Sequence, residues 1–479
     1  MEQPSSRKAV LSEILDRVDA WLEDSLTGAE PVIDFQRPEV LKAKLDLRLD
    51  GKGGGTDALI AETEKYLRHA VRTAHPAYLN QLFGGFNLAA FAGEIVTAAT
   101  NTSMYTYEVA PVATLMEMAV VEKMRSYTGW TTGTGSMMTG GSNTNLVAML
   151  LARNSIFKGA KEEGITGLPK LAVFVSERAH FSMLKAANTT GIGAAAVVKV
   201  PVDENGRMRG AALEQAMKET IARGRMPFMV CSTAGTTETG SFDAIDEVSD
   251  FAERHKLWHH VDGSWCAGLI LSPRYRPLFK GLDRADSFSW NPHKLMNIPL
   301  VCSVLLVKDP NIMRREIQSH DADYIYHEND TSHYDMGPAS LQCGRRVDVL
   351  KLWMAWKYYG DDGYAARIER LGELAAYATR RAETDPQFEL TFPTQTLNVN
   401  FRCAVPEGVD ADRFNENLRY RLIREGSAMV NYCRLDSGLS IRLVLLNPDL
   451  TEADLDRFFD AVADAAEAER TALQAAAEH

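Results

Sequence analysis

The chain has 479 residues, of which 45% are hydrophobic and 24% charged, and 64 acidic against 52 basic residues give a formal net charge of -12. This composition is typical of a folded protein with one large domain and smaller terminal parts. The negative charge argues against partners such as nucleic acids and anionic membranes, which need basic surfaces.

No apolar run has the length of a membrane-spanning helix, and the N-terminal stretch MEQPSSRKAV lacks the apolar block of a signal peptide. We therefore expect a cytoplasmic protein. The cysteines form no CxxC pair and no metal-ligand pattern with histidine, so we expect buried thiols without disulfides and no metal site. The six cysteines are Cys231, Cys266, Cys302, Cys343, Cys403 and Cys433.

Apolar side chains recur at helical spacing from Lys8 to Leu26, which predicts an amphipathic first helix. The loop GKGGGT, residues 51–56, precedes a second helical stretch over 57–73. We expect residues 1–105 to form an N-terminal helical arm. The apolar face of the first helix has no clear partner in this arm, which is compatible with packing against a second subunit.

Residues 106–345 are expected to form a large α/β domain, because short apolar runs alternate there with helical stretches. This alternation predicts a mostly parallel sheet with helices on both faces and a ligand site at the carboxyl ends of the strands. The predicted strands cover residues 171–176, 195–200, 228–233, 257–262 and 302–307.

Residues 346–479 are expected to form a small C-terminal α+β domain. Helical patterns cover 347–359 and 364–383, and strand patterns occur near 388–401 and 440–445. A last helix starts at Thr451, and Asp454 takes the place of the usual Glu or Gln of a capping box.

Lys294 lies in SFSWNPHKLMNIPLVCS, residues 287–303, after a proline turn and between two apolar strands. Burial lowers the pKa of an ammonium group and frees the amine to form an imine with an aldehyde. A surface lysine at a strand end is the alternative.

Asp262 ends the predicted strand LWHHVD, and a buried carboxylate there needs a cation, such as the pyridinium nitrogen of pyridoxal phosphate. A capping or loop aspartate is the alternative.

TGGSNTNLVAML, residues 139–150, places two glycines and a serine before a helical run, a pattern typical of an anion site and also of a simple turn. Gly141 and Ser142 are the candidate phosphate contacts. His180, just after the strand 171–176, could cover one face of a cofactor or be a structural histidine. Thr237 could bind the cofactor or cap a turn.

These segments together resemble the group II pyridoxal-phosphate-dependent amino-acid decarboxylases, over nearly the whole chain. The matching motifs are HVDGSW, SWNPHK, TGGSNTN, SERAHFS and QCGRRVD. HPAYLNQLFGG and NTSMYTYEVAP resemble the glutamate and cysteine-sulfinate decarboxylase branch. The resemblance implies the fold of fold-type I pyridoxal-phosphate-dependent transferases and a homodimer with shared active sites.

Position by position, the resemblance implies that Lys294 is the Schiff-base lysine, Asp262 the partner of the ring nitrogen and His180 the stacking ring. Arg442 would hold the substrate α-carboxylate as a planar two-pronged donor. The implied phosphate contacts are Gly141, Ser142, Asn291 and His293. The implied substrate pocket consists of Gln81, Phe83, Ser103 and Tyr105, which look more like the cysteine-sulfinate type and favour a short acidic side chain.

The family carries a mobile loop before QCG whose tyrosine returns a proton to the α-carbon after carbon dioxide leaves. Here the loop reads YIYHENDTSHYDMGPASLQCG and is shorter. Tyr334 is the candidate donor, although ungapped counting back from Gln342 reaches Asp330.

The resemblance thus implies α-decarboxylation of a small acidic L-amino acid, such as cysteine sulfinate, aspartate or glutamate. Transamination or oxidative deamination would need the same Lys294 and Asp262. A pyridoxal-phosphate-binding protein without turnover is the alternative from another class; it would have no need for Arg442 as a substrate clamp.

Overall fold

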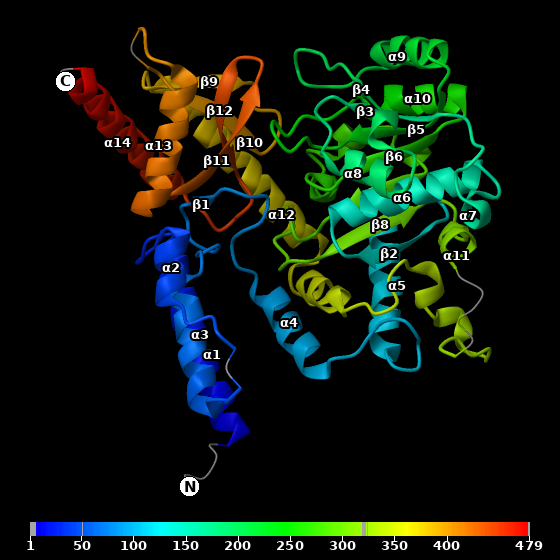
Figure 1. The fold of residues 1–479 in the computed structure, drawn as a ribbon, viewed down its shortest axis with the longest axis horizontal. Coiled ribbons are helices and arrows are strands. Elements are labelled where there is room, and N and C mark those ends of the chain that lie inside the picture. Colours follow the sequence, from blue (N-terminus) through cyan, green and yellow to red (C-terminus); the bar gives the residue numbers. More distant parts are fainter. Residues whose placement is uncertain (1–5, 50, 319–321, 323, 406, 478–479) are drawn as a thin grey trace. The chain divides into compact units, whose positions relative to one another are not determined.

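The computed structural model describes residues 6–49, 51–318, 322, 324–405 and 407–477. Met1 to Ser5, which the expectation about a signal peptide includes, lie outside these residues. Contacts divide the chain into two compact units, one formed by Met1–Phe86 with Glu373–His479 and the other by Asn87–Gly372 (Figure 1). The N-terminal and C-terminal segments thus share one unit, and the three-part division at residues 105 and 345 stays a prediction.

The unit Asn87–Gly372 is built on a seven-stranded sheet with the order β2-β8-β7-β6-β5-β3-β4. The strands from β4 to β7 pair in parallel, whereas β8 pairs antiparallel with both β7 and β2. The strands are β2 (Thr134–Met138), β3 (Leu171–Ser176), β4 (Val197–Val200), β5 (Met226–Thr233), β6 (Trp258–Gly263), β7 (Ser287–Trp290) and β8 (Ser303–Val307).

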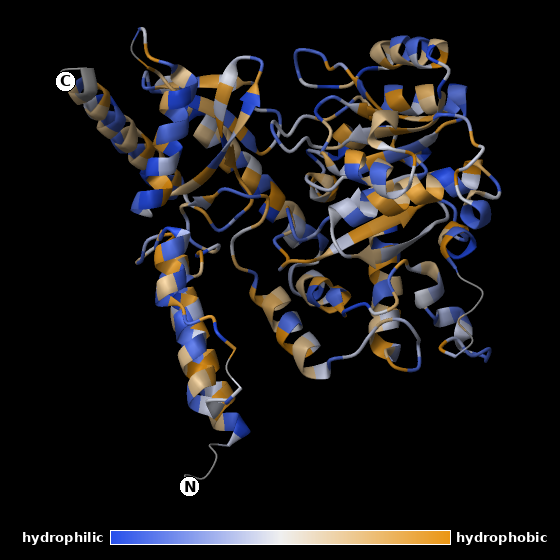
Figure 2. Ribbon diagram, in the orientation of Figure 1, coloured by the Kyte–Doolittle hydropathy of each residue, from blue (hydrophilic) through white to orange (hydrophobic). Residues whose placement is uncertain are grey.

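Successive side chains of a strand point to opposite faces of the sheet, and here both faces are apolar. Helices therefore pack against both faces. In β3, Val173 and Val175 pack in the cluster that contains α6 and α8, whereas Phe174 packs with α9 and α10 on the other face. The sheet strands are strongly hydrophobic in Figure 2. The helices are α4 (Leu88–Thr100), α5 (Pro111–Arg125), α6 (Gly141–Ile156), α7 (Ala160–Glu163), α8 (Ser182–Thr189), α9 (Gly210–Ala222), α10 (Ile245–His255) and α11 (Ile312–Ile317).

The other unit contains a five-stranded sheet with the order β1-β11-β12-β10-β9, in which only the β1–β11 pair is parallel. Its strands are β1 (Tyr78–Leu79), β9 (Phe388–Phe392), β10 (Asn398–Cys403), β11 (Met429–Leu435) and β12 (Gly438–Val444). Its helices are α1 (Arg7–Thr27), α2 (Pro38–Lys44), α3 (Gly55–His69), α13 (Ala411–Glu425) and α14 (Glu452–Ala477). The helix α12 (Asp348–Thr384) belongs to both units and has a non-helical residue, Gly360, at φ 64°.

The predicted α/β class and mostly parallel sheet are confirmed. The strand expected at 195–200 starts only at Val197, after a 3-10 turn, and the helix expected at 57–73 ends at His69. At the start of α14, Thr451 Oγ1 and N both donate to the Asp454 carboxylate, at 2.6 and 2.7 Å, and Asp454 N donates back to Thr451 Oγ1 at 3.2 Å. The predicted capping box is therefore present with Asp in the acidic position.

The expectation of six buried thiols is wrong for one residue, since Cys343 is exposed while the other five cysteines are buried. Cys343 lies in the irregular QCGRR segment before α12, where no sheet or helix covers it. Among the described residues, no helix is both long and apolar enough to cross a bilayer.

Candidate active site

Lys294 lies in the connection between two neighbouring strands at the edge of the parallel part of the sheet. β7 ends at Trp290, and β8 returns antiparallel beside it from Ser303, with Trp290 opposite Val304. The Asn-Pro-His-Lys turn therefore starts at the carboxyl end of β7, the end at which β5 and β6 also finish. A cavity of about 170 Å³ opens there.

This cavity brings together most of the residues predicted to bind the cofactor. Lys294, Asp262 and His180 line it with Gly141, Ser142, Asn291 and His293. Thr237 is not among the described lining residues; Thr233 at the end of β5 and Gly235 in the connection after it line the cavity instead. Ser264 and Trp265, which follow Asp262 directly, line the cavity as well and were not predicted.

Asp262 is a buried carboxylate held by three hydrogen-bond donors. It accepts from Asn145 Nδ2 at 2.7 Å, from Ser289 Oγ at 3.0 Å and from its own loop at Ser264 N, also at 3.0 Å. Burial by itself would raise the Asp262 pKa, but His260 and the hydrogen bonds from Ser264 and Asn145 outweigh burial and lower it to about 2. Asp262 is therefore an anion at neutral pH and suits a cationic ring nitrogen.

The other end of the cavity is formed by the start of α6. A side chain at Gly141 would place its Cβ 2.5 Å from Asn291 Nδ2 and 2.8 Å from Ser264 Oγ, so it would displace these two side chains of the cavity. The first turn of a helix has free N–H groups and a positive end that favour an anion. The buried Asn291 side chain has no hydrogen-bond partner for either polar atom among the described residues, and Thr233 Oγ1 also lacks one.

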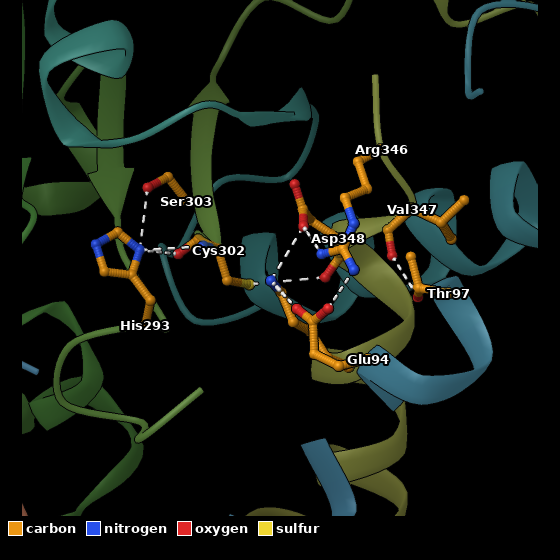
Figure 3. A network of polar contacts seen from close by, with 9 residues as sticks. Glu94, Thr97, His293, Cys302, Ser303, Arg346, Val347 and Asp348 are labelled. Carbon is orange, nitrogen blue, oxygen red and sulfur yellow. Dashed lines mark hydrogen bonds and ion pairs between the residues drawn. The ribbon is translucent and has the colours of Figure 1, made fainter. Parts of the chain in front are cut away.

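His293 is buried beside Lys294, and burial lowers its pKa to about 4. Its Nδ1 lies 2.6 Å from the carbonyl oxygen of Cys302 (Figure 3). Cys302 Sγ in turn contacts the carbonyl oxygen of Asp348, at the start of α12. There the ammonium of Lys351, whose side chain is only 1% exposed, is 2.6 Å from Glu94 and 3.0 Å from Asp348. This ion cluster links α4 to α12 and was not predicted.

His180 lies on the cavity wall just before α8. Its Nδ1 is 2.8 Å from Ser182 Oγ and accepts from Ser182 N at 3.3 Å. Burial lowers the pKa of His180, so the ring is neutral at pH 7.

Several polar residues behind Asp262 and His180 were missed by the sequence analysis, namely Asn145, Ser182, His260 and Ser289. Asn145 follows Gly141 by one helical turn within TGGSNTN, and this spacing is the signal that could have identified it. His260 and Asp262 are two apart in β6, which places them on one face of the strand.

Three predicted substrate residues lie in the unit Met1–Phe86 with Glu373–His479. Arg442 is buried in β12, between β11 and β10, and its Nη2 donates to the carbonyl oxygen of Asn80 at 3.0 Å. Gln81 follows Asn80 directly and is exposed, and Phe83 stacks near Tyr78 with ring centroids 5.9 Å apart. Arg442 and the segment that contains Gln81 are therefore neighbours.

Ser103 and Tyr105 lie in the other unit, between α4 and α5, and do not line the Lys294 cavity as described. Arg345 N donates to Ser103 Oγ at 3.2 Å, and Gly337 N donates to Tyr105 O at 2.9 Å. The guanidinium of Arg345 also pairs with Glu117 at 2.9 Å. The segment that contains Ser103 and Tyr105 is thus attached to residues 337–345.

Tyr334 lies in a short 3-10 turn, and its ring is 5.1 Å from that of Tyr107. It lines a cavity of about 410 Å³ together with Met118 and Arg314. The described lining of the Lys294 cavity does not include Tyr334. Its role as proton donor therefore stays a prediction.

The geometry fits pyridoxal phosphate on three independent observations. The cavity combines a lysine amine with an anionic carboxylate, and it includes buried polar atoms of Asn291 and Thr233 that lack partners among the described residues. A side chain at Gly141 would displace Asn291 and Ser264 from the cavity edge. A ring with a cationic nitrogen, an aldehyde and a phosphate matches this donor set.

Comparison with known proteins agrees with this chemistry. The chain is 37% identical over 469 residues to the cysteine sulfinic acid decarboxylase of Mus musculus, with 95% of both chains covered. It is 36% identical to the glutamate decarboxylase of Drosophila melanogaster, with 96% of this chain and 93% of the relative covered. The crystal structure of mouse CSAD superposes with a TM-score of 0.92 at 36% identity, covering 96% of this chain and 98% of the other.

Residues 38–404 match the family described as the pyridoxal-dependent decarboxylase conserved domain. The chain is accordingly a carboxy-lyase of the pyridoxal-dependent decarboxylase family, with pyridoxal 5'-phosphate as its cofactor.

Proposed function

We propose that the protein removes the α-carboxylate of a small acidic L-amino acid, of the cysteine-sulfinate, aspartate or glutamate type, and releases the amine and carbon dioxide. The observation that supports this most is the Lys294 cavity with an anionic Asp262 at its wall. The acidic substrate is supported by relatives that are named cysteine sulfinic acid, acidic amino acid and glutamate decarboxylases.

In this proposal Lys294 binds the cofactor aldehyde, and Asp262 keeps the ring nitrogen protonated. Gly141, Ser142, Asn291 and His293 contact the phosphate, and Thr237 stays a predicted contact. When bound, the cofactor supplies a ring that accepts the electron pair of the bond that breaks. His180 covers one face of that ring and limits access of water.

Arg442 is proposed to hold the substrate α-carboxylate, which suits its planar pair of donors. Arg442 is buried in β12 beside the segment that contains Gln81, since its Nη2 donates to the carbonyl oxygen of Asn80. Gln81, Phe83, Ser103 and Tyr105 are proposed to select a short acidic side chain. One methylene in a substrate changes selectivity by only about 1 to 3 kcal/mol, so aspartate and glutamate analogues should differ by roughly 10- to 200-fold at most.

A substrate panel tests this function. Purified protein loaded with pyridoxal phosphate is incubated with cysteine sulfinate, cysteate, aspartate, glutamate and an aromatic amino acid, and amine and carbon dioxide are quantified together. We expect equimolar amine and carbon dioxide from at least one acidic substrate. Turnover confined to the aromatic amino acid would refute the pocket assignment.

The same assay separates decarboxylation from the alternative reactions. Keto acid, aldehyde or peroxide in place of amine would indicate transamination or oxidative deamination. Amine forms only if a donor returns a proton to the α-carbon, and Tyr334 is the candidate donor. Tyr334 lines a different cavity from Lys294, so the products have to be measured.

We also propose that the protein is a homodimer. Apolar side chains on α4 and α5 are exposed, with Leu88 at 61%, Val112 at 63% and Leu115 at 47%. Ile95 and Val96 of α4 add to this surface. A symmetric dimer would bury exposed apolar side chains such as these. The cytoplasmic location stays a prediction.

Light scattering coupled to size-exclusion chromatography tests the dimer. We expect twice the chain mass of 53.0 kDa for the unaltered protein and a shift towards the monomer for Val112→Glu. Exposed Leu278, at 36%, lies outside this surface, so Leu278→Glu should leave the mass unchanged. A monomeric unaltered protein would refute the proposal.

A further inference from the structure

A continuous chain of hydrogen bonds runs behind the Lys294 cavity and connects Asp262 with His180. Asn145, on α6, is its branch point. Its Nδ2 donates to Asp262 Oδ2 at 2.7 Å and to Ser182 Oγ at 2.8 Å, and its Oδ1 is 3.0 Å from His260 Nε2. Asn145, Ser182 and His260 are all buried.

The direction of each hydrogen bond follows from Asp262. An ionised carboxylate only accepts, so the Asn145 amide must turn its NH₂ group towards Asp262 and its oxygen towards His260. An amide oxygen also only accepts, so His260 must carry its proton on Nε2. His260 is neutral because burial lowers its pKa to about 4, and its Nδ1 therefore accepts from Ser287 Oγ, 2.8 Å away.

The other branch fixes His180. Ser182 Oγ accepts one hydrogen bond from Asn145 and lies 2.8 Å from His180 Nδ1. The backbone N–H of Ser182 also points at Nδ1, at 3.3 Å. Because Ser182 Oγ already accepts from Asn145, its own hydroxyl proton can point at Nδ1 at the shorter distance, and the longer backbone contact agrees with an unprotonated Nδ1. The proton of neutral His180 then resides on Nε2.

We propose that Asn145 is a positioning residue which, through Ser182, fixes His180 as the neutral tautomer protonated on Nε2 and at the same time holds Asp262 in place. This inference rests on the proposed function and deepens it, because it assigns the protonation of the ring that covers the cofactor. His180 then presents a hydrogen-bond donor and no positive charge on a wall that already contains Lys294. The charged groups that act on His180 are Asp262, Lys294 and Lys185.

Nitrogen NMR of protein labelled with ¹⁵N-histidine tests the proposal. His180 is one of 11 histidines, and its resonances are assigned by their loss in His180→Gln. At pH 7 we expect an unprotonated Nδ1 and a protonated Nε2, in the cofactor-free and in the loaded protein. In Ser182→Ala and in Asn145→Ser we expect averaged resonances from both tautomers, and a fall in kcat of at least about tenfold.

Asn154→Ser is the matched control, since Asn154 is also buried on α6 but donates to the carbonyl oxygen of Glu316, away from the cavity. It should leave the His180 resonances and kcat unchanged. A proton on Nδ1 in the unaltered protein, or unchanged His180 resonances in both Ser182→Ala and Asn145→Ser, overturns the proposal. If the protein does not bind pyridoxal phosphate, the proposed function fails, and the spectra of the cofactor-free protein still decide this inference.

Discussion

Replacement of Lys294 by alanine is expected to give a folded protein that forms no covalent link to pyridoxal phosphate and loses at least roughly 10³-fold in decarboxylase activity. The reason is that Lys294 is the one amine among the described lining residues of the cavity that contains Asp262 and Asn291. The measurement is reduction with borohydride, followed by mass spectrometry of the peptides and by the amine assay.

Lys280→Ala provides the matched control, because Lys280 is an exposed lysine of the same unit that pairs with Asp246 on the surface. The control should retain both the trapped adduct on Lys294 and the activity. An adduct at another lysine, or full activity of Lys294→Ala, would show that the cofactor is bound elsewhere.

The second large effect concerns the buried ion pair of Glu117 and Arg345. Their side chains are 0% and 4% exposed, and Arg345 Nη1 lies 2.9 and 3.0 Å from the two carboxylate oxygens. Glu117→Gln leaves a buried guanidinium without its counter-charge, so we expect a loss of about 3 to 5 kcal/mol in the free energy of unfolding. Urea unfolding followed by fluorescence measures this loss.

The double variant Glu117→Leu with Arg345→Met is the informative comparison. It removes both charges and replaces them with apolar side chains of similar size, so it should recover most of the stability that Glu117→Gln loses. Because the Arg345 guanidinium also donates to the carbonyl oxygen of Met104, directly after Ser103, the double variant should still change the preference among acidic substrates. If Glu117→Gln unfolds at the same urea concentration as the unaltered protein, the pair has no structural role.

The strands and the cofactor cavity could be predicted because their signals are local in the sequence. Five apolar runs identified β3, β4, β5, β6 and β8. Asp262 lies at the carboxyl end of β6, and Lys294 lies in the turn after β7. The strands β1, β2 and β11 were missed for physical reasons, β1 because it is only two residues long. β2 has the sequence TGSMM, in which glycine and serine do not form an apolar run although its last four residues are buried. β11 has the sequence MVNYCRL, in which polar residues interrupt the apolar ones.

The parts of the site that were not predictable depend on contacts between distant segments. Asn145 and Asp262 are hydrogen-bonded although they are 117 residues apart in the sequence. Arg345 and Glu117, which are also hydrogen-bonded, are 228 residues apart. No spacing rule connects such pairs, because the path of the chain through the sheet decides which side chains meet. Thr237 shows the same limit on a smaller scale: the turn after β5 was predicted, but Thr233 and Gly235 line the cavity in its place.

The hairpin of β7 and β8 has a consequence for how the protein acquires its cofactor. Trp290 and Val304 lie opposite each other in the antiparallel pair of β7 and β8, so strands adjacent in sequence close the segment that includes Lys294 into a short loop. Closing such a short loop costs little conformational entropy of the chain, and the chain loses this entropy when the sheet forms. We therefore expect the β7–β8 pair to position the Lys294 amine before pyridoxal phosphate binds, so that cofactor binding requires little rearrangement of the backbone.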